Sequence, residues 1–256
     1  NEEYKSSKVD KNHRKKHNND FALWKISKAG EPFRDSPWSK GRPGWHIECS
    51  AMSIGALGDH FDIHCGGVDN LFPHHENEIA QSVCATGKSF VNYWLHSEHL
   101  LFDSEKMSKT SGNYYKIQEL KKKGFTPESI RYLLLSGHYR TKISFKMGKK
   151  HESDKVIEKV SNFYTMLKEN INNSKPTSML PGAYLMFRDA MNDDLNTPKA
   201  LGIFFKWMKF FSAKQKNKSI KPADISSALN FFNVFDSIFG FTINTVTEIP
   251  ESVREL

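Results

Sequence analysis

Between residues 45 and 115 the chain alternates short runs of strand-forming residues with stretches that have helical spacing. The pattern predicts a short strand at residues 61–64, which stops at the glycine pair 66–67. It also predicts one or two strands over residues 91–102, which are rich in aromatic and β-branched residues, and a helix between the two regions. This order is typical of an open parallel sheet, in which ligands bind beyond the carboxyl ends of the strands.

The helix between these strands has a recognisable start and one apolar stripe. Asp69 or Asn70 is expected to cap it, with Pro73 in its first turn, where a proline is tolerated. Ile79 and Val83 lie four residues apart and are expected to form its buried face. Polar residues with the same spacing would also share one face of this helix.

Beyond about residue 125 the pattern predicts helices only. Thr126 and Thr197, each followed by proline, start two of them, and the last one ends at Gly240. Large apolar residues recur at three- and four-residue steps, and ten of the 19 phenylalanines follow residue 186. We therefore expect a helical bundle with its own aromatic core.

Composition narrows the class of protein. The chain has 256 residues, of which 38% are hydrophobic and 26% charged, and no window approaches the ~18 consecutive apolar residues of a membrane span. The three cysteines, Cys49, Cys65 and Cys84, cannot form a closed disulfide framework, so a reducing compartment, the cytoplasm, is expected. The net charge of +8 is compatible with a nucleic-acid partner.

One candidate metal site combines Cys49 with the sequence PHHENE at 73–78. His74 and Glu78 are four residues apart on the predicted helix, so both side chains can reach one ion. His75 with Glu78 is the alternative at a spacing of three. Thiolate, imidazole and carboxylate together suit Zn²⁺. An ordinary surface pair or helix cap would explain the same spacing.

Two further patterns suit a nucleotide. Lys106 and Lys109 lie three residues apart in a loop rich in Ser, Thr and Gly, where mobile charges could stabilise a polyphosphate leaving group. Gly67 allows close approach of a nucleotide to the backbone, and the Asp69 carboxylate could accept hydrogen bonds from ribose hydroxyls. A solvated lysine loop and a helix cap at Asp69 are the simpler interpretations.

Six motifs occur in a fixed order: DFALWK at 20–25, GWHIECS at 44–50, HFDIH at 60–64, FPHHENE at 72–78, KMSK at 106–109 and SGHYR at 136–140. Together they resemble the cysteinyl-tRNA synthetases, a class I aminoacyl-tRNA synthetase family, as far as the DDLNTP segment at 193–198. The resemblance implies an α/β fold: the second half of a Rossmann-like parallel-sheet catalytic domain, followed by an all-α helical bundle domain. We expect the chain to lack the amino-terminal half, which carries the His-Ile-Gly-His signature.

The resemblance also implies residue roles. One Zn²⁺ per subunit would be held by Cys49, His74 and Glu78, with a fourth ligand, a cysteine, from the amino-terminal half. Cys65 is not assigned as a ligand, because relatives usually carry glycine there. The lysine loop resembles the Lys-Met-Ser-Lys-Ser signature, with Thr110 at its last position. The other implied roles are catalysis by Lys106 and Lys109, ATP binding by Lys109, Gly67 and Asp69, and substrate binding by Trp45.

The implied reaction is activation of L-cysteine by ATP, with Mg²⁺, followed by transfer of the cysteinyl group to tRNA(Cys). We expect a monomer with no membrane association. Four segments are expected: a basic linker at 1–20, the half catalytic domain at 21–124, a helical connecting region at 125–150 and a truncated helical bundle on the anticodon side of the tRNA at 151–256. Two alternatives stay open, a paralogous ligase that joins cysteine to an amino-sugar and a non-catalytic module that binds zinc or RNA.

Overall fold

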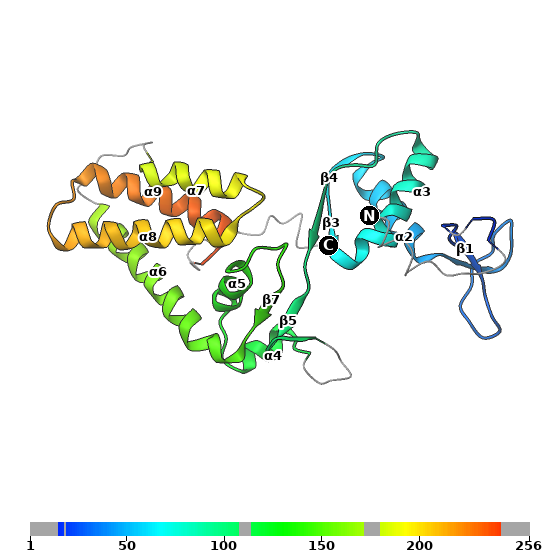
Figure 1. Ribbon diagram of the computed structural model, residues 1–256, viewed down its shortest axis with the longest axis horizontal. Helices are drawn as coiled ribbons and strands as arrows, with labels where there is room; N and C mark the ends of the chain where they lie inside the picture. Colours follow the sequence, from blue (N-terminus) through cyan, green and yellow to red (C-terminus); the bar gives the residue numbers. More distant parts are fainter. Residues whose placement is uncertain (1–14, 18, 108–113, 172–179, 242–256) are drawn as a thin grey trace. The chain divides into compact units, whose positions relative to one another are not determined.

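The computed structural model describes residues 15–17, 19–107, 114–171 and 180–241, and it divides into two compact units between Glu98 and His99 (Figure 1). None of the helices in these ranges has the length and apolar character that a bilayer crossing requires.

The first unit is built around a parallel pair of strands. Its elements are β1 (Trp24–Ile26), β2 (Gly41–Pro43), α2 (Trp45–Leu57), β3 (Phe61–Gly67), the short turns η1 (Val68–Asn70) and η2 (Leu71–His75), α3 (Glu76–Thr86) and β4 (Val91–Ser97). β1 and β2 form an antiparallel pair, and β3 and β4 a parallel pair in which Gly67 lies opposite Ser97. The predicted order of strand, glycine turn, helix and strand is confirmed, and α3 is the crossover.

The crossover helix starts later than the sequence predicts. Phe72 has extended backbone angles (φ −138°, ψ 133°), so helical geometry is interrupted there and α3 begins at Glu76. The prediction that Asp69 or Asn70 caps this helix is wrong: His75 occupies the cap position, and no side chain makes a cap hydrogen bond.

The buried face of α3 also differs from the prediction. Val83 is 38% exposed and Ile79 is only half-buried. The residues of α3 that are buried are polar: Asn77, Glu78 and Ser82. On this face Glu78 contacts His64 of β3 and His74 of the turn that precedes the helix.

The second unit combines a small sheet with a helical bundle. Its elements are β5 (Leu100–Phe102), β6 (Glu105–Lys106), α4 (Ile117–Lys122), α5 (Pro127–Leu135), β7 (Ile143–Phe145), η3 (Met147–Lys149), α6 (Lys150–Asn170), α7 (Gly182–Asn192), α8 (Thr197–Lys216) and α9 (Pro222–Phe239). The strand order is β6-β5-β7, with β5 antiparallel to β6 and parallel to β7. The expectation of helices only beyond residue 125 is therefore wrong at β7, a three-residue strand that exists because it pairs with β5.

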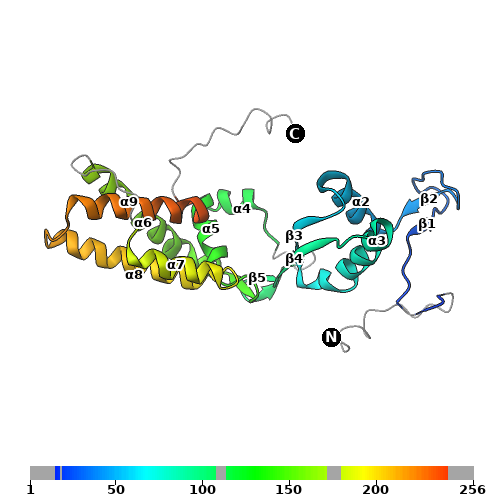
Figure 2. The same cartoon turned by 90° about the horizontal axis from the view of Figure 1, so that it is seen from above.

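The helical bundle has the predicted aromatic core, and Figures 1 and 2 show α7 and α8 side by side in it. Thr126 accepts a hydrogen bond from the backbone of Ser129 and so caps α5. α8 begins at Thr197 as predicted, although Asn196 is the residue that caps it. α9 ends at Gly240, which adopts the left-handed conformation (φ 61°) that favours glycine.

Phe235 lies at the centre of this core, and its replacement by alanine tests the packing. It is fully buried on α9, with its ring centroid 3.5 Å from that of Phe204. We expect Phe235→Ala to lower the free energy of unfolding by about 3–5 kcal/mol, because it leaves a cavity among aromatic rings. Phe210→Ala on α8 is the control, since Phe210 is 59% exposed. Chemical denaturation measures both, and equal losses would contradict the packing described here.

Candidate functional site

The first turns of α2 bring two predicted site residues to one end of the first unit. The N-cap residue Gly44 has extended backbone geometry, and α2 then carries Trp45 and Cys49 four residues apart, on one face of the helix. The Trp45 side chain is 60% exposed, yet its ring stacks on the imidazole of His74, with centroids 4.5 Å apart. Trp45 is therefore next to one of the candidate metal ligands.

Glu78 is the fully buried charged residue at the centre of this region. Its Oε1 atom lies 3.0 Å from Nε2 of His74, and its Oε2 atom lies 3.0 Å from Nε2 of His64. Within the described residues, Oε1 accepts no hydrogen bond despite the proximity of His74. Burial of a negative charge costs free energy unless a positive or hydrogen-bonding group lies next to it, so a cation near this oxygen would be stabilising.

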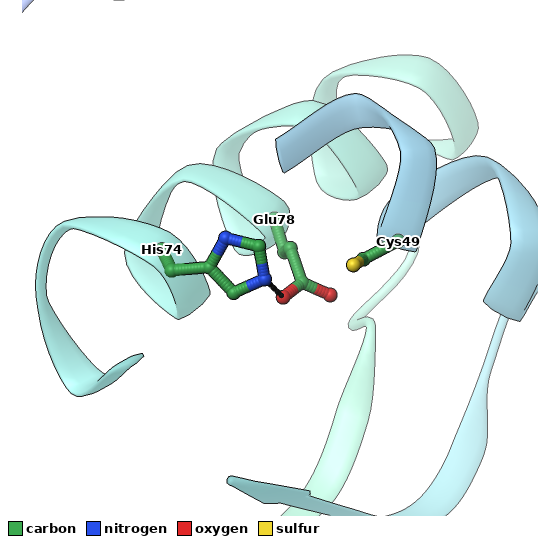
Figure 3. Close-up of side chains that lie close together, drawn as sticks. All are labelled: Cys49, His74 and Glu78. Carbon is green, nitrogen blue, oxygen red and sulfur yellow. Dashed lines mark ion pairs between the residues drawn. The ribbon is translucent and has the colours of Figure 1, made fainter. Parts of the chain in front are cut away.

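The three residues expected to bind zinc lie together (Figure 3). Sγ of Cys49, an imidazole nitrogen of His74 and a carboxylate oxygen of Glu78 are all within 4.8 Å of one another. Burial raises the pKa of the Cys49 thiol, and the negative charges of Glu78 and Glu48 raise it further. A cation at the centre of the group would reverse this effect, so the donor set fits a metal of the zinc type.

The alternative spacing, His75 with Glu78, also forms a compact group. Donor atoms of His64, His75 and Glu78 lie within 4.8 Å of one another. Nδ1 of His75 is 2.7 Å from Nε2 of His96. Burial, followed by the charges of His64, His96 and His74, lowers the pKa of His75 to about 4, so this ring is neutral at pH 7.

Sequence reasoning missed the histidines that surround the three expected ligands. His46, from α2, has its Nδ1 atom 2.6 Å from Nδ1 of His74, and His64, from β3, contacts Glu78. Both lie inside motifs that the sequence analysis singled out, GWHIECS and HFDIH. Nothing in the sequence pattern pointed to His96 on β4, which reaches the group because β3 and β4 pair in parallel.

The expected nucleotide residues lie at the carboxyl end of β3. Gly67 is the last residue of that strand, and Asp69 follows in η1 with an exposed side chain. The Asp69 carboxylate folds back over the glycine, so that an added Cβ at Gly67 would lie 2.5 Å from its Oδ1 atom. The Asp69 carboxylate and the backbone of Gly67, which has no side chain, therefore lie beside each other at the carboxyl end of β3. α/β sheets bind ligands at this position.

The lysine loop belongs to the second unit. Lys106 is the last residue of β6, and Lys109 lies outside the described residues. The metal candidates belong to the first unit. The joint action of these lysines with the metal group therefore stays a prediction.

Comparison with known families identifies the class of protein. Residues 1–155 match the family model described as "tRNA synthetases class I (C) catalytic domain", and residues 186–244 match the DALR domain. The first match covers more than half of the chain, so the chain belongs to this class I tRNA synthetase family.

Curated relatives narrow the family further. The cysteine--tRNA ligase of Brachyspira hyodysenteriae is 43% identical over 240 residues, which cover 87% of this chain and 50% of that protein. The cysteine--tRNA ligase of Carboxydothermus hydrogenoformans is 40% identical over 255 residues, 95% of this chain and 53% of that protein. The resemblance to the cysteinyl-tRNA synthetases is thus confirmed, and the chain spans about half the length of the curated relatives it matches.

A solved structure supports the fold alone. The agnB2 LeuRS of Agrobacterium radiobacter K84, in a ternary complex with tRNA and LeuAMS, superposes with a TM-score of 0.63 at 11% sequence identity. The match covers 82% of this chain and 33% of that protein. Together with the family matches, it confirms the expected fold class, a class I synthetase catalytic domain with parallel strands followed by a helical domain.

Gly66 allows the close packing of the histidine group and provides a test of it. A Cβ added at Gly66 would lie 2.6 Å from Cε1 and 2.8 Å from Nε2 of His75. We expect Gly66→Ala to lower the free energy of unfolding of the full-length protein by about 1–3 kcal/mol, because the ring must shift.

The control for this change is Gly55→Ala in α2, where an added Cβ would meet nothing within 4 Å. Alanine in a helix interior should leave the stability unchanged or raise it by up to about 1 kcal/mol. Thermal and chemical denaturation of the two variants measure the difference. Equal stability of the two variants would show that His75 does not pack on Gly66 as described.

Proposed function

We propose that the full-length protein to which this chain belongs is a cysteine--tRNA ligase, which activates L-cysteine with ATP and transfers it to tRNA(Cys). The observation that carries the proposal is the group formed by Cys49, His74 and Glu78, in a chain 43% identical to a curated cysteine--tRNA ligase. The experiment is a charging assay in which tRNA(Cys) and a panel of amines, amino-sugars included, compete as acceptors. Transfer to an amine but not to tRNA would contradict the proposal.

The proposed metal ligands suit the discrimination that such an enzyme must achieve. Cysteine and serine differ by one atom, and pocket shape alone separates such similar substrates by only about 10–200-fold. A zinc ion held by Cys49, His74 and Glu78 would lower the pKa of the substrate thiol and bind the thiolate, whereas the hydroxyl of serine stays neutral and binds poorly. The chain would then select sulfur by its chemistry, without relying on size.

The side chains around the ligands have supporting roles in this proposal. His64 contacts Oε2 of Glu78 and would so fix the orientation of the carboxylate, with Oε1 next to His74. The ring of Trp45 lies against His74 and would form one wall of the amino-acid pocket. Gly67 and Asp69 would hold the ribose of ATP, through the open backbone and the carboxylate respectively.

Lys106 and Lys109 would act on the phosphates. In the activation step the substrate carboxylate attacks the α-phosphorus of ATP, and pyrophosphate leaves with the electrons of the broken P–O bond. Ammonium groups stabilise the negative charge that develops on this leaving group. The two lysines would therefore contribute mainly to the transition state and little to cysteine binding.

Removal of a ligand tests the metal site. We expect Cys49→Ala and His74→Ala in the full-length enzyme to lower the bound zinc from about one per subunit to none, because the remaining donors cannot complete a tetrahedral site. Cysteine-dependent pyrophosphate exchange should be lost with the metal. Metal analysis and the exchange assay give independent readouts.

The matched control for this test is Cys84→Ala, because Cys84 is an exposed cysteine of α3 outside the metal group. It should retain both zinc and exchange activity. A zinc-free Cys49→Ala enzyme that exchanges pyrophosphate at the wild-type rate would rule out the proposed role of the metal.

Replacement of Lys109 tests the role of the lysine loop. Lys109→Ala should slow adenylate formation about 10²–10³-fold, since it removes a charge that acts in the transition state, and should leave the dissociation constant of cysteine unchanged. Lys122→Ala, at the exposed end of α4, should change neither quantity. Weaker cysteine binding with an unchanged chemical step would be the opposite of this expectation.

A further inference from the structure

Asp194 lies at the corner between α7 and α8, and both of its carboxylate oxygens accept hydrogen bonds. The Tyr139 hydroxyl donates to Oδ1 at 2.5 Å, and the Arg140 guanidinium donates from Nε to Oδ2 at 2.5 Å and from Nη2 to Oδ1 at 3.2 Å. Hydrogen bonds from Arg140 and Tyr139 lower the pKa of the carboxyl, which is therefore ionised at neutral pH. We call Tyr139, Arg140 and Asp194 the corner clamp.

The corner clamp joins segments that belong to two different family modules. Tyr139 and Arg140 lie within the part matched by the catalytic domain model, residues 1–155, whereas Asp194 lies within the DALR match, residues 186–244. A planar guanidinium that donates two bonds to one carboxylate fixes both distance and direction. The clamp therefore orients the segment that follows α5 against the α7–α8 corner.

The corner clamp is expected to contribute little to the stability of the fold. The side chains of Arg140 and Asp194 are 57% and 44% exposed, and ion pairs this open to solvent contribute little to folding. Asp194 and Leu195 both have φ 53°, in the left-handed region that residues with a Cβ rarely adopt. An unfavourable backbone conformation is thus maintained where it aims a carboxylate at Arg140.

A short path of backbone pairing leads from the clamp to the lysine loop. β7 begins at Ile143, three residues after Arg140, and pairs in parallel with β5. The turn between β5 and β6 is bound to β7 as well, because the backbone of Ser104 donates to Oγ of Ser144 at 2.8 Å. β6 ends at Lys106, the first lysine of the loop.

We propose that Asp194 is a positioning residue for the start of the lysine loop at Lys106: through Arg140 and Tyr139 it holds the segment that leads into β7, and β7 holds the β5–β6 hairpin, whose last residue is Lys106. This inference rests on the proposed function. The helical domain would thereby set the geometry of the ATP phosphates during adenylate formation. Cysteine affinity and zinc binding, which depend on residues of the first unit, should not depend on the clamp.

The test is Asp194→Asn in the full-length enzyme, which keeps the size of the side chain and removes the charge that Arg140 binds. We expect kcat of cysteine-dependent pyrophosphate exchange to fall about 10-fold, since small misplacements far from the reacting atoms reduce rates by up to about 100-fold. The KM for cysteine, the zinc content and the melting temperature should stay at the wild-type values. A purely structural role would instead lower the melting temperature along with kcat.

The matched control is Asp193→Asn. The neighbouring Asp193 side chain is exposed and pairs with Lys199 at 3.5 Å, outside the corner clamp. It should exchange pyrophosphate at the wild-type rate.

Arg140→Gln disrupts the clamp from the other side and keeps the test valid if Asp194→Asn folds poorly. The double variant, Asp194→Asn with Arg140→Gln, should lose no more kcat than either single variant, because both changes remove one interaction.

Three outcomes would overturn the inference. If Asp194→Asn and Arg140→Gln retain wild-type exchange, the clamp does not position the loop. If exchange is retained while tRNA charging falls, the clamp orients the helical domain for tRNA instead. If the wild-type enzyme itself shows no cysteine-dependent exchange, the proposed function fails and this inference fails with it, an outcome that the wild-type measurement separates from the other two.

Discussion

The buried carboxylate of Glu78 is the constraint that organises the first unit. A fully buried negative charge is tolerated only when positive or hydrogen-bonding groups surround it. His64 of β3 and His74 of the turn before α3 each lie 3.0 Å from one of its two oxygens. Glu78 thus lies on the inward face of α3, and Trp45 stacks on His74, one of its two partners.

The same constraint connects the fold to the proposed chemistry. Burial, and after it the negative charges of Glu78 and Glu48, raise the pKa of the Cys49 thiol, so this thiol holds its proton more tightly than a thiol in water. The pair of Cys49 and Glu78 becomes a good donor set only when a cation is present, because the cation favours the ionised form of both groups. This pair is unfavourable in the protein without a cation. In the proposed function, this pair gives the site its affinity for a soft metal, and the bound metal in turn binds the sulfur of the substrate.

The second unit is stabilised by interactions of two different kinds. Its core is a set of closely packed aromatic rings, which contribute a large but weakly directional stabilisation. Directional polar contacts then join separate segments: Arg131 of α5 donates hydrogen bonds to the last carbonyls of α9, and the corner clamp joins the α7–α8 corner to the segment before β7. Aromatic packing gives the bundle its stability, and the polar contacts fix the directions in which these segments meet.

The sequence by itself determined the features that depend on neighbouring residues. Thr126 and Gly240 mark helix ends through local backbone chemistry, and the glycines at 66–67 end a strand, so these elements were predictable. The ordered motifs were enough to identify the family and, through it, the candidate ligands Cys49, His74 and Glu78.

Tertiary structure decided what depends on residues distant in the sequence. β7 exists only because β5 lies beside it, and the contact of His64 with Glu78 requires β3 to lie beside α3. The buried position of Glu78 on α3 depends on the same kind of contact, since its partners His64 and His74 belong to other elements, whereas the apolar pattern of the helix pointed to Val83. Helical and strand periodicity report which residues of one element share a face, whereas the partner that covers the face is set by the packing of the whole unit.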